Sequence, residues 1–147
     1  EELHLNSIIT GIFELFEKTG NDKLSFTKKI TDEDIFVYAD KSHLIRIINN
    51  LLKNAIQAIP NDHSGKIFVS LYKDIDKAII QIKDNGHGID DSKKEKIFIP
   101  NFTTKSSGSG LGLPICKKLI ESMDGEIFFE TEVNKGTSFF VKLPIKI

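Results

Sequence analysis

The stretch KIFVSLYKDIDKAIIQIKDNGHGI, residues 66–89, reads as two strands joined by a tight turn. Apolar and polar side chains alternate along residues 66–74 and again along 77–86, and the turn falls at residues 74–76. An alternation of period two is typical of strands that bury one face. The sequence therefore predicts an antiparallel hairpin whose second strand ends at a carboxylate, Asp84, and continues into a turn with two glycines.

Periodicity typical of helices appears on both sides of this hairpin. Apolar residues recur three and four positions apart along residues 5–16, and Gly20 provides a stop. The same spacing along residues 44–59 predicts a longer helix that Pro60 ends. A third helix is expected along residues 114–123, because the proline at its start occupies a first-turn position that needs no N–H.

Further strands complete the predicted fold. Short strands are expected at residues 25–30 and 34–40, and a second hairpin at residues 126–133 and 138–145 around a turn at 134–136. Because helices alternate with antiparallel hairpins, the expected fold class is α/β, a two-layer α/β sandwich. We expect one mixed, mostly antiparallel sheet packed on about three helices, with its other face partly open. A chain of 147 residues is long enough for one such domain.

Composition excludes several classes of function. The net charge of -1, with both signs spread along the chain, gives no electrostatic basis for nucleic acid or an anionic membrane surface as primary partner. The single cysteine, Cys116, excludes an internal disulfide and is expected to be a small buried hydrophobe rather than a reactive thiol. No apolar run reaches the length of a membrane span, and we find no signal peptide. Because the chain opens at Glu1 rather than a methionine, we read it as a piece of a longer protein.

Three glycines, Gly108, Gly110 and Gly112, precede the third helix. They follow a polar run, so they fit neither the P-loop nor the dinucleotide fingerprint. The helix start offers no Ser, Thr, Asp or Asn cap, so its first N–H groups lack a local partner that an anion could replace. A solvated loop whose glycines only turn the chain is the alternative, and this stretch alone leaves both open.

A narrow polar stripe follows one face of the long helix, at the positions Arg46, Asn50, Lys53, Asn54 and Gln57. Asparagine is a poorer helix former than the Glu and Lys of ordinary surfaces, yet taken alone the stripe still reads as a solvated face. The DNGHGI turn, taken alone, is likewise only a turn signal. Their occurrence together with the glycine-rich helix start, in this order and with strands between, favours a common site.

Here the sequence resembles the catalytic, ATP-binding domains of sensor histidine kinases, within the Bergerat-fold superfamily. The resemblance covers nearly the whole chain and implies a Bergerat fold with an ATP lid. Five motifs carry it in order: NNLLKNAIQA as the N box, DNGHGI as the first glycine box, IFIPNFTTK as the F box, GSGLGL as the second glycine box and GTSFFVKLP as the closing strand.

The resemblance assigns roles at the purine end of a nucleotide. Asp84 would accept a hydrogen bond from the adenine amino group, and Thr137 would join through a water. Gly86 and Gly88 would let the purine lie close to the backbone.

At the other end, Asn54 and Asn50 would hold Mg²⁺ through their amide oxygens, which suits a hard cation. Gln57 stands where many members carry Lys or Arg, as in the subgroup that reads Asn-Ala-x-Gln-Ala, and Lys53 or Arg46 would have to compensate for the missing charge. The phosphates would be held by the segment that contains Lys105, Gly108, Gly110, Leu111, Gly112 and Leu113. Asn54 and Lys105 are the residues implied in catalysis.

The implied activity is that of a protein-histidine kinase, with Mg-ATP as donor and a histidine on an upstream dimerisation domain as acceptor. No histidine in this chain opens the family's phosphoacceptor pattern, so residues 1–147 would be the catalytic domain alone. The implied partners are ATP, that dimerisation domain and, through the full-length kinase, a response regulator. The parent would be a homodimer and the isolated domain a cytoplasmic monomer, with the parent either free or membrane-anchored.

Other functions within the superfamily stay open. ATP-hydrolysing relatives such as type II topoisomerases and heat-shock chaperones place a general-base glutamate where this chain has Asn50, which cannot take a proton from water. An anti-sigma-type serine kinase would share the glycine boxes but lacks the segment 98–105 as it stands here. A nucleotide-binding pseudokinase or interaction module is the third alternative.

The segment 90–110 is expected to form the lid over the nucleotide, because it is long and rich in Ser, Lys and Gly. For its apolar residues Ile97 and Phe98, packing on the domain's own core is an equal alternative. Phe102, between polar neighbours, is the better candidate for contact with a partner.

Overall fold

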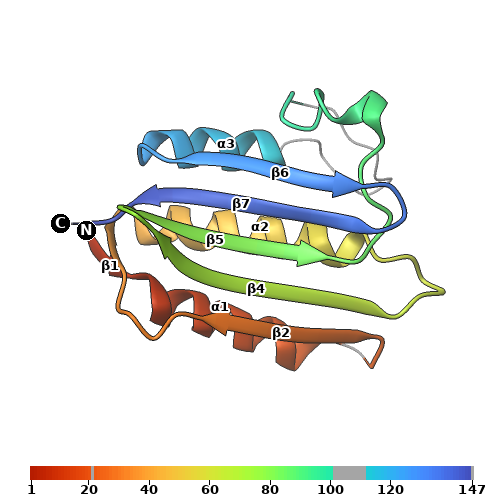
Figure 1. The fold of residues 1–147 in the computed structure, drawn as a ribbon, viewed down its shortest axis with the longest axis horizontal. Coiled ribbons are helices and arrows are strands. Elements are labelled where there is room, and N and C mark those ends of the chain that lie inside the picture. The colour runs from red at the N-terminus through yellow and green to blue at the C-terminus, as the bar shows by residue number, and fades with distance from the viewer. Residues whose placement is uncertain (21, 101–111, 147) are drawn as a thin grey trace.

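The computed structural model describes residues 1–20, 22–100 and 112–146. Its main sheet has five strands in the order β2-β4-β5-β7-β6 (Figure 1). β2 runs parallel to β4, and the other neighbours pair antiparallel, which confirms the mixed, mostly antiparallel sheet. The strands are β2 (Leu24–Ile30), β4 (Gly65–Asp74), β5 (Lys77–Asp84), β6 (Glu126–Glu132) and β7 (Gly136–Pro144).

The described helices lie against one face of this sheet, so the two-layer architecture is confirmed. α2 lies behind β5 and β7 in Figure 1, while α1 and α3 lie toward the β2 and β6 edges. The helices are α1 (Leu5–Thr19), α2 (Lys41–Gln57) and α3 (Gly112–Ser122). Within the described ranges, no helix is long and apolar enough to cross a lipid bilayer.

A second, two-stranded sheet pairs β1 (Glu2–His4) antiparallel with β3 (Phe36–Tyr38). The sequence predicted the strand around β3 but not its partner, because three residues directly before a helix carry no readable periodicity. The backbone N–H of Lys146 donates to the carbonyl of Phe36 at 2.8 Å. The two ends of the chain therefore meet at one corner of the molecule (Figure 1).

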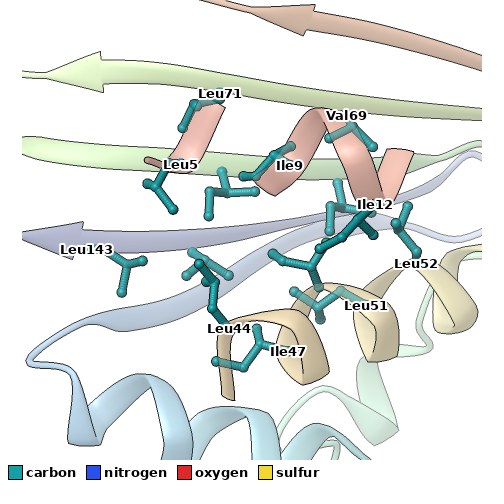
Figure 2. Close-up of a cluster of buried hydrophobic side chains, with 14 of the residues drawn as sticks. Leu5, Ile9, Ile12, Leu44, Ile47, Leu51, Leu52, Val69, Leu71 and Leu143 are labelled. Carbon is teal, nitrogen blue, oxygen red and sulfur yellow. The ribbon is translucent and has the colours of Figure 1, made fainter. Parts of the chain in front are cut away.

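The core lies between the helices and the sheet. Figure 2 shows the side chains of α1 and α2 gathered against β4 and β7, among them Leu5, Ile9, Ile12, Leu44, Ile47, Leu51, Leu52, Val69, Leu71 and Leu143. Burial of each such side chain is worth about 1.5–3 kcal/mol relative to exposure. Since the apolar face of α2 is committed to this core, its polar stripe is turned away from the centre of the core.

α2 begins at Lys41, three residues before the predicted start of this helix, and is capped by Asp40. At its start, Asp40 accepts hydrogen bonds from the N–H of Ser42 at 2.9 Å and of His43 at 3.2 Å. The bond from the Ser42 hydroxyl, followed by that from the His43 N–H, lowers the pKa of Asp40 below its ordinary value. At its end, α2 stops at Gln57, shortly before Pro60.

The described part of the predicted lid is anchored to the core. After a short 3-10 helix, η1 (Asp91–Lys93), Ile97 and Phe98 pack against the core cluster. The Phe98 ring lies 6.1 Å from that of Phe129, and Lys117 Nζ lies 5.8 Å from the Phe98 ring centre. Of the two alternatives for Ile97 and Phe98, core packing is the one observed. The predicted contact residue Phe102 lies outside the described residues, so the lid itself stays a prediction.

Candidate functional site

The carboxylate of Asp84 ends β5 on the face that carries the core residues Ile80 and Ile82. Only 4% of Asp84 is exposed. Its Oδ1 accepts the N–H of Gly86 at 2.9 Å, which fixes the carboxylate at the start of the turn. On the neighbouring strand its register partner is Thr137, which is also buried. Two buried polar side chains thus lie next to each other at one end of an otherwise apolar layer.

The turn that follows Asp84 rests on the C-terminal end of α2. His87 N–H donates to the carbonyl of Ala58 at 3.0 Å, and Ala58 N–H itself donates to the carbonyl of Asn54 at 3.0 Å. A Cβ added at Gly86 would lie 2.3 Å from the Ala58 carbonyl oxygen. Glycine at this position therefore lets the turn meet the helix one turn beyond Asn54.

The same turn contacts the connection between β6 and β7 from the other side. Asn134 N–H donates to the carbonyl of His87 at 2.8 Å. Gly88 has a φ of 74°, and a Cβ there would lie 2.4 Å from the carbonyl oxygen of Glu132. The protein's own backbone thus explains the glycines at 86 and 88, and their part in admitting a purine stays a prediction.

Polar side chains in the turn and in the loop after α2 stabilise the turn through hydrogen bonds to backbone groups. Asn85 Oδ1 accepts the N–H of Lys66 at 2.7 Å, and its Nδ2 donates to the carbonyl of Ser64 at 3.2 Å. His63 Nε2 donates to the carbonyl of Asn85 at 3.2 Å, and His87 Nδ1 donates to the carbonyl of Gly88 at 2.6 Å. Both histidines therefore serve the local structure of the turn.

The polar stripe of α2 divides into two parts. Asn50 and Asn54 are half-buried, whereas Arg46, Lys53 and Gln57 are exposed. The amide oxygen of Asn50 lies 4.0 Å from the position of a Cβ built on Gly112, the first residue of α3. Asn50 therefore sits at the start of α3.

The thiol of Cys116, one turn along α3, is also close to Asn50. Burial raises the pKa of this thiol to about 11, an effect that a hydrogen bond from Asn50 and the charge of Arg46 only partly offset. Its Sγ lies 3.9 Å from the carbonyl of Ile47. The expectation that this cysteine is buried is confirmed, and its lack of reactivity stays a prediction.

Apart from Asn50, Gln57 and Gly112, the site residues predicted from the sequence fall into three groups. Asp84, Gly86, Gly88 and Thr137 come together around the end of β5, and Asn54 is tied to them through Ala58. Leu113 packs its half-buried side chain against the core. Outside the described residues lie Lys105, Gly108, Gly110 and Leu111.

One residue of this region was missed in the sequence analysis. Thr131 Oγ1 lies 2.8 Å from Thr137 Oγ1, accepts the N–H of Ile89 at 2.9 Å and donates to the carbonyl of Gly136 at 3.1 Å. A signal for it exists: residues 127 and 129 place apolar side chains on the helix side of β6, and the next position of that alternation is this threonine.

Comparison with known proteins agrees with this arrangement. The family model described as Histidine kinase-, DNA gyrase B-, and HSP90-like ATPase matches residues 39–147. Sporulation kinase E of Bacillus subtilis (strain 168) is 34% identical over 148 residues, which is 99% of this chain but only 20% of that protein. The nucleotide-free catalytic domain of histidine kinase ThkA is 36% identical with a TM-score of 0.86, and the match covers 98% of this chain and 94% of that one.

A second structure of ThkA, in complex with the response regulator protein TrrA, is 32% identical with a TM-score of 0.81 and covers 99% of this chain and 42% of that one. The family match spans most of the chain, and the ThkA domain matches it nearly end to end. The chain therefore belongs to the histidine kinase-, DNA gyrase B- and HSP90-like ATPases and, within them, to the catalytic ATP-binding domains of sensor histidine kinases.

Proposed function

We propose that this domain binds Mg-ATP and presents the γ-phosphate to a histidine carried by a separate dimerisation domain. The observation that carries the proposal is the buried carboxylate of Asp84, which lies beside Thr137 and leads into a turn that rests on the C-terminal end of the helix bearing Asn50 and Asn54. Burial of a carboxylate must be offset by hydrogen bonds such as the one from Gly86 N–H, and a carboxylate has two oxygens that can accept several bonds. Relatives named as kinases, among them sporulation kinase E, support the same function.

At the purine end, Asp84 would accept a hydrogen bond from the amino group of adenine. The bond from Gly86 N–H holds the carboxylate in one orientation before the ligand arrives. Because Asp84 and Thr137 are both buried, a hydrogen bond made there is shielded from water and gains strength. Thr137 would join through a bridging water.

At the phosphate end, the amide oxygens of Asn50 and Asn54 would hold Mg²⁺. Their chemistry fits a hard cation, which prefers oxygen ligands and keeps several waters. Among the side chains that the structure describes, no three His, Cys, Asp or Glu residues gather into a metal-binding group, so phosphate oxygens and water would complete the coordination. When bound, the ion neutralises charge on the phosphates during transfer.

The remaining phosphate contacts would come from Lys105 and the glycine-rich segment before α3. Gly112, the first residue of α3, lies beside Asn50. Phosphates bound at the start of α3 would therefore be within reach of a metal ion held by Asn50 and Asn54. Gln57 is exposed and neutral, and exposed Lys53 or Arg46 would supply the charge that other members place at that position.

The acceptor histidine would lie in another domain of a longer, homodimeric parent. His63 and His87 are tied into the turn, and His4 contacts Asp34 and Ser7 through its two ring nitrogens. Phosphoryl transfer depends mostly on positioning and charge neutralisation, so donor and acceptor can sit on separate domains. A response regulator would take the phosphate next, as the complex of ThkA with TrrA suggests. We place this domain in the cytoplasm, where ATP is available.

The test is titration calorimetry of the Asp84→Asn variant with Mg-ATP. Replacing an acceptor by an amide that also donates should weaken binding roughly ten- to hundredfold. Asp76→Asn makes the same chemical change in the exposed turn before β5 and should leave the affinity unchanged. Unchanged affinity in Asp84→Asn would remove the proposed purine contact. Binding without transfer to a supplied dimerisation domain would favour the pseudokinase alternative.

A further inference from the structure

A row of three polar side chains crosses the helix-facing side of the sheet at one end. Asp84 on β5 pairs in register with Thr137 on β7, which pairs with Thr131 on β6. The same row continues through Ile67 on β4 to Phe26 on β2, and both of these are apolar. Neighbours in such a row lie about 4.5–5.5 Å apart at their Cβ atoms. The polar part of the row is thus confined to the strands that border the candidate site.

The hydroxyl of Thr131 has no bonding capacity left for a ligand. A hydroxyl donates one proton and accepts through two lone pairs. Ile89 N–H fills one lone pair of Thr131, and the proton of Thr131 goes to the carbonyl of Gly136, which can only accept. The contact with Thr137, at 2.8 Å, therefore uses the second lone pair, with Thr137 as donor. Any effect of Thr131 on a ligand must pass through the groups that it holds.

These contacts join the two sides of the purine end of the site. Ile89 is the last residue of the turn that begins at Asp84, and Thr137 is the register partner of Asp84. Because its proton is directed to Thr131, the Thr137 hydroxyl presents its lone pairs to its surroundings. Strand pairing alone does not need this hydroxyl, since the other positions on this side of β6, Ile127 and Phe129, are apolar.

We infer that Thr131 is a positioning residue for the purine end of the nucleotide site, an inference that rests on the function proposed above. It fixes the rotamer of Thr137 and the backbone at Ile89 relative to Asp84. Removal of its hydroxyl frees Thr137 to rotate and leaves the Ile89 N–H without its acceptor. The side chain of Thr137 and the backbone at Ile89 are then less ordered where adenine would bind. The affinity for the nucleotide falls although no ligand contact has been deleted.

The experiment measures Mg-ATP affinity by calorimetry in four variants of the chain and in one control variant. Thr131→Val keeps the shape of the side chain and should weaken binding about tenfold, whereas Thr131→Ser keeps the hydroxyl and should stay within about twofold. Thr137→Val should weaken binding as well. In the double variant, the loss should be smaller than the product of the two single losses, because part of the effect of Thr131 passes through Thr137.

Ser138→Ala is the matched control, since Ser138 follows Thr137 but accepts a hydrogen bond from Gln81 at 3.3 Å on the opposite face of the sheet. Its affinity should be unchanged. The positioning role would be overturned if the affinity losses of the two single variants multiplied in the double variant. It would also be overturned if Thr131→Ser bound Mg-ATP as weakly as Thr131→Val. Failure of the unaltered chain to bind Mg-ATP would instead overturn the proposed function.

A measurement on the unaltered chain keeps the inference testable if Thr131→Val does not fold. The amide of Ile89 should be protected from hydrogen exchange without nucleotide, because its N–H is bonded to the Thr131 hydroxyl. Exchange at the rate of an exposed loop would show that the contact does not persist in solution and would overturn the inference.

Discussion

Cys116 gives the most direct residue-scale test of the packing between α2 and α3. It is completely buried, and burial raises the pKa of its thiol to about 11. We expect no reaction with a thiol reagent in the folded protein near pH 8, and rapid reaction in denaturant. Fast labelling of the folded chain would mean that α3 separates readily from α2.

The same thiol predicts a pH dependence. The folded pKa lies above the value of about 8.5 for an unfolded cysteine, so the contribution of Cys116 to stability is present below that value and is lost as the pH rises toward 11. Cys116→Ala lacks this group. The difference in unfolding free energy between the two proteins should therefore move in favour of Cys116→Ala at alkaline pH, which urea titrations at two pH values would measure.

The positions of single residues were predictable from the sequence where the residues belong to a motif. They were less predictable where only tertiary packing determines their role. Asp84 and Thr137, both assigned through the resemblance, do lie side by side. The reason given for Gly86 was a close purine, whereas the space of its missing Cβ is filled by Ala58. Thr131 was missed because a threonine in a strand looks ordinary until its register with Thr137 is known.

At the scale of elements, the turn between β4 and β5 contains a strained residue. Ile75 has a φ of 57° and is 87% exposed. A left-handed conformation costs a β-branched residue roughly 1–2 kcal/mol, whereas asparagine tolerates it. Ile75→Asn should therefore raise the free energy of unfolding by about 1 kcal/mol.

Urea unfolding followed by circular dichroism checks this prediction. Asp76→Asn, in the same two-residue turn but without a positive φ, is the control and should change little. A destabilised Ile75→Asn variant would mean that the exposed isoleucine makes a contact that outweighs its backbone strain.

Elements with many residues in one pattern were predicted with nearly correct bounds. α2 has a long apolar stripe and a proline after its end, and the hairpin of β4 and β5 has a clear alternation. The parallel pairing of β2 with β4 was not predictable, because it joins segments separated by α2 and β3 and no local signal records it. β1 is too short to show a period.

At the scale of the whole molecule, the domain should donate phosphate but not accept it. Incubation of the chain with labelled Mg-ATP should leave it unlabelled, since none of its four histidines opens the family's phosphoacceptor pattern and those at 4, 63 and 87 are also engaged in local contacts. Addition of a dimerisation domain from a related kinase should produce acid-labile phosphate on that domain. Asn54→Ala should abolish this transfer, and acid-labile phosphate on the chain itself would contradict the separation of donor and acceptor.

The close backbone packing around the turn after Asp84 limits which substitutions this sequence can accept over evolutionary time. At Gly86, Gly88 and Gly136, the nearest atom to an added Cβ is a backbone carbonyl oxygen, at 2.3, 2.4 and 2.0 Å. A backbone atom cannot rotate away as a side chain can, so even alanine would force the chain to move at these positions. Selection for a folded domain alone would then preserve these glycines in a descendant that had ceased to use ATP. In a descendant that had lost kinase activity, substitutions at Asn50, Asn54 and Thr131 would therefore be expected to accumulate before substitutions of the glycines.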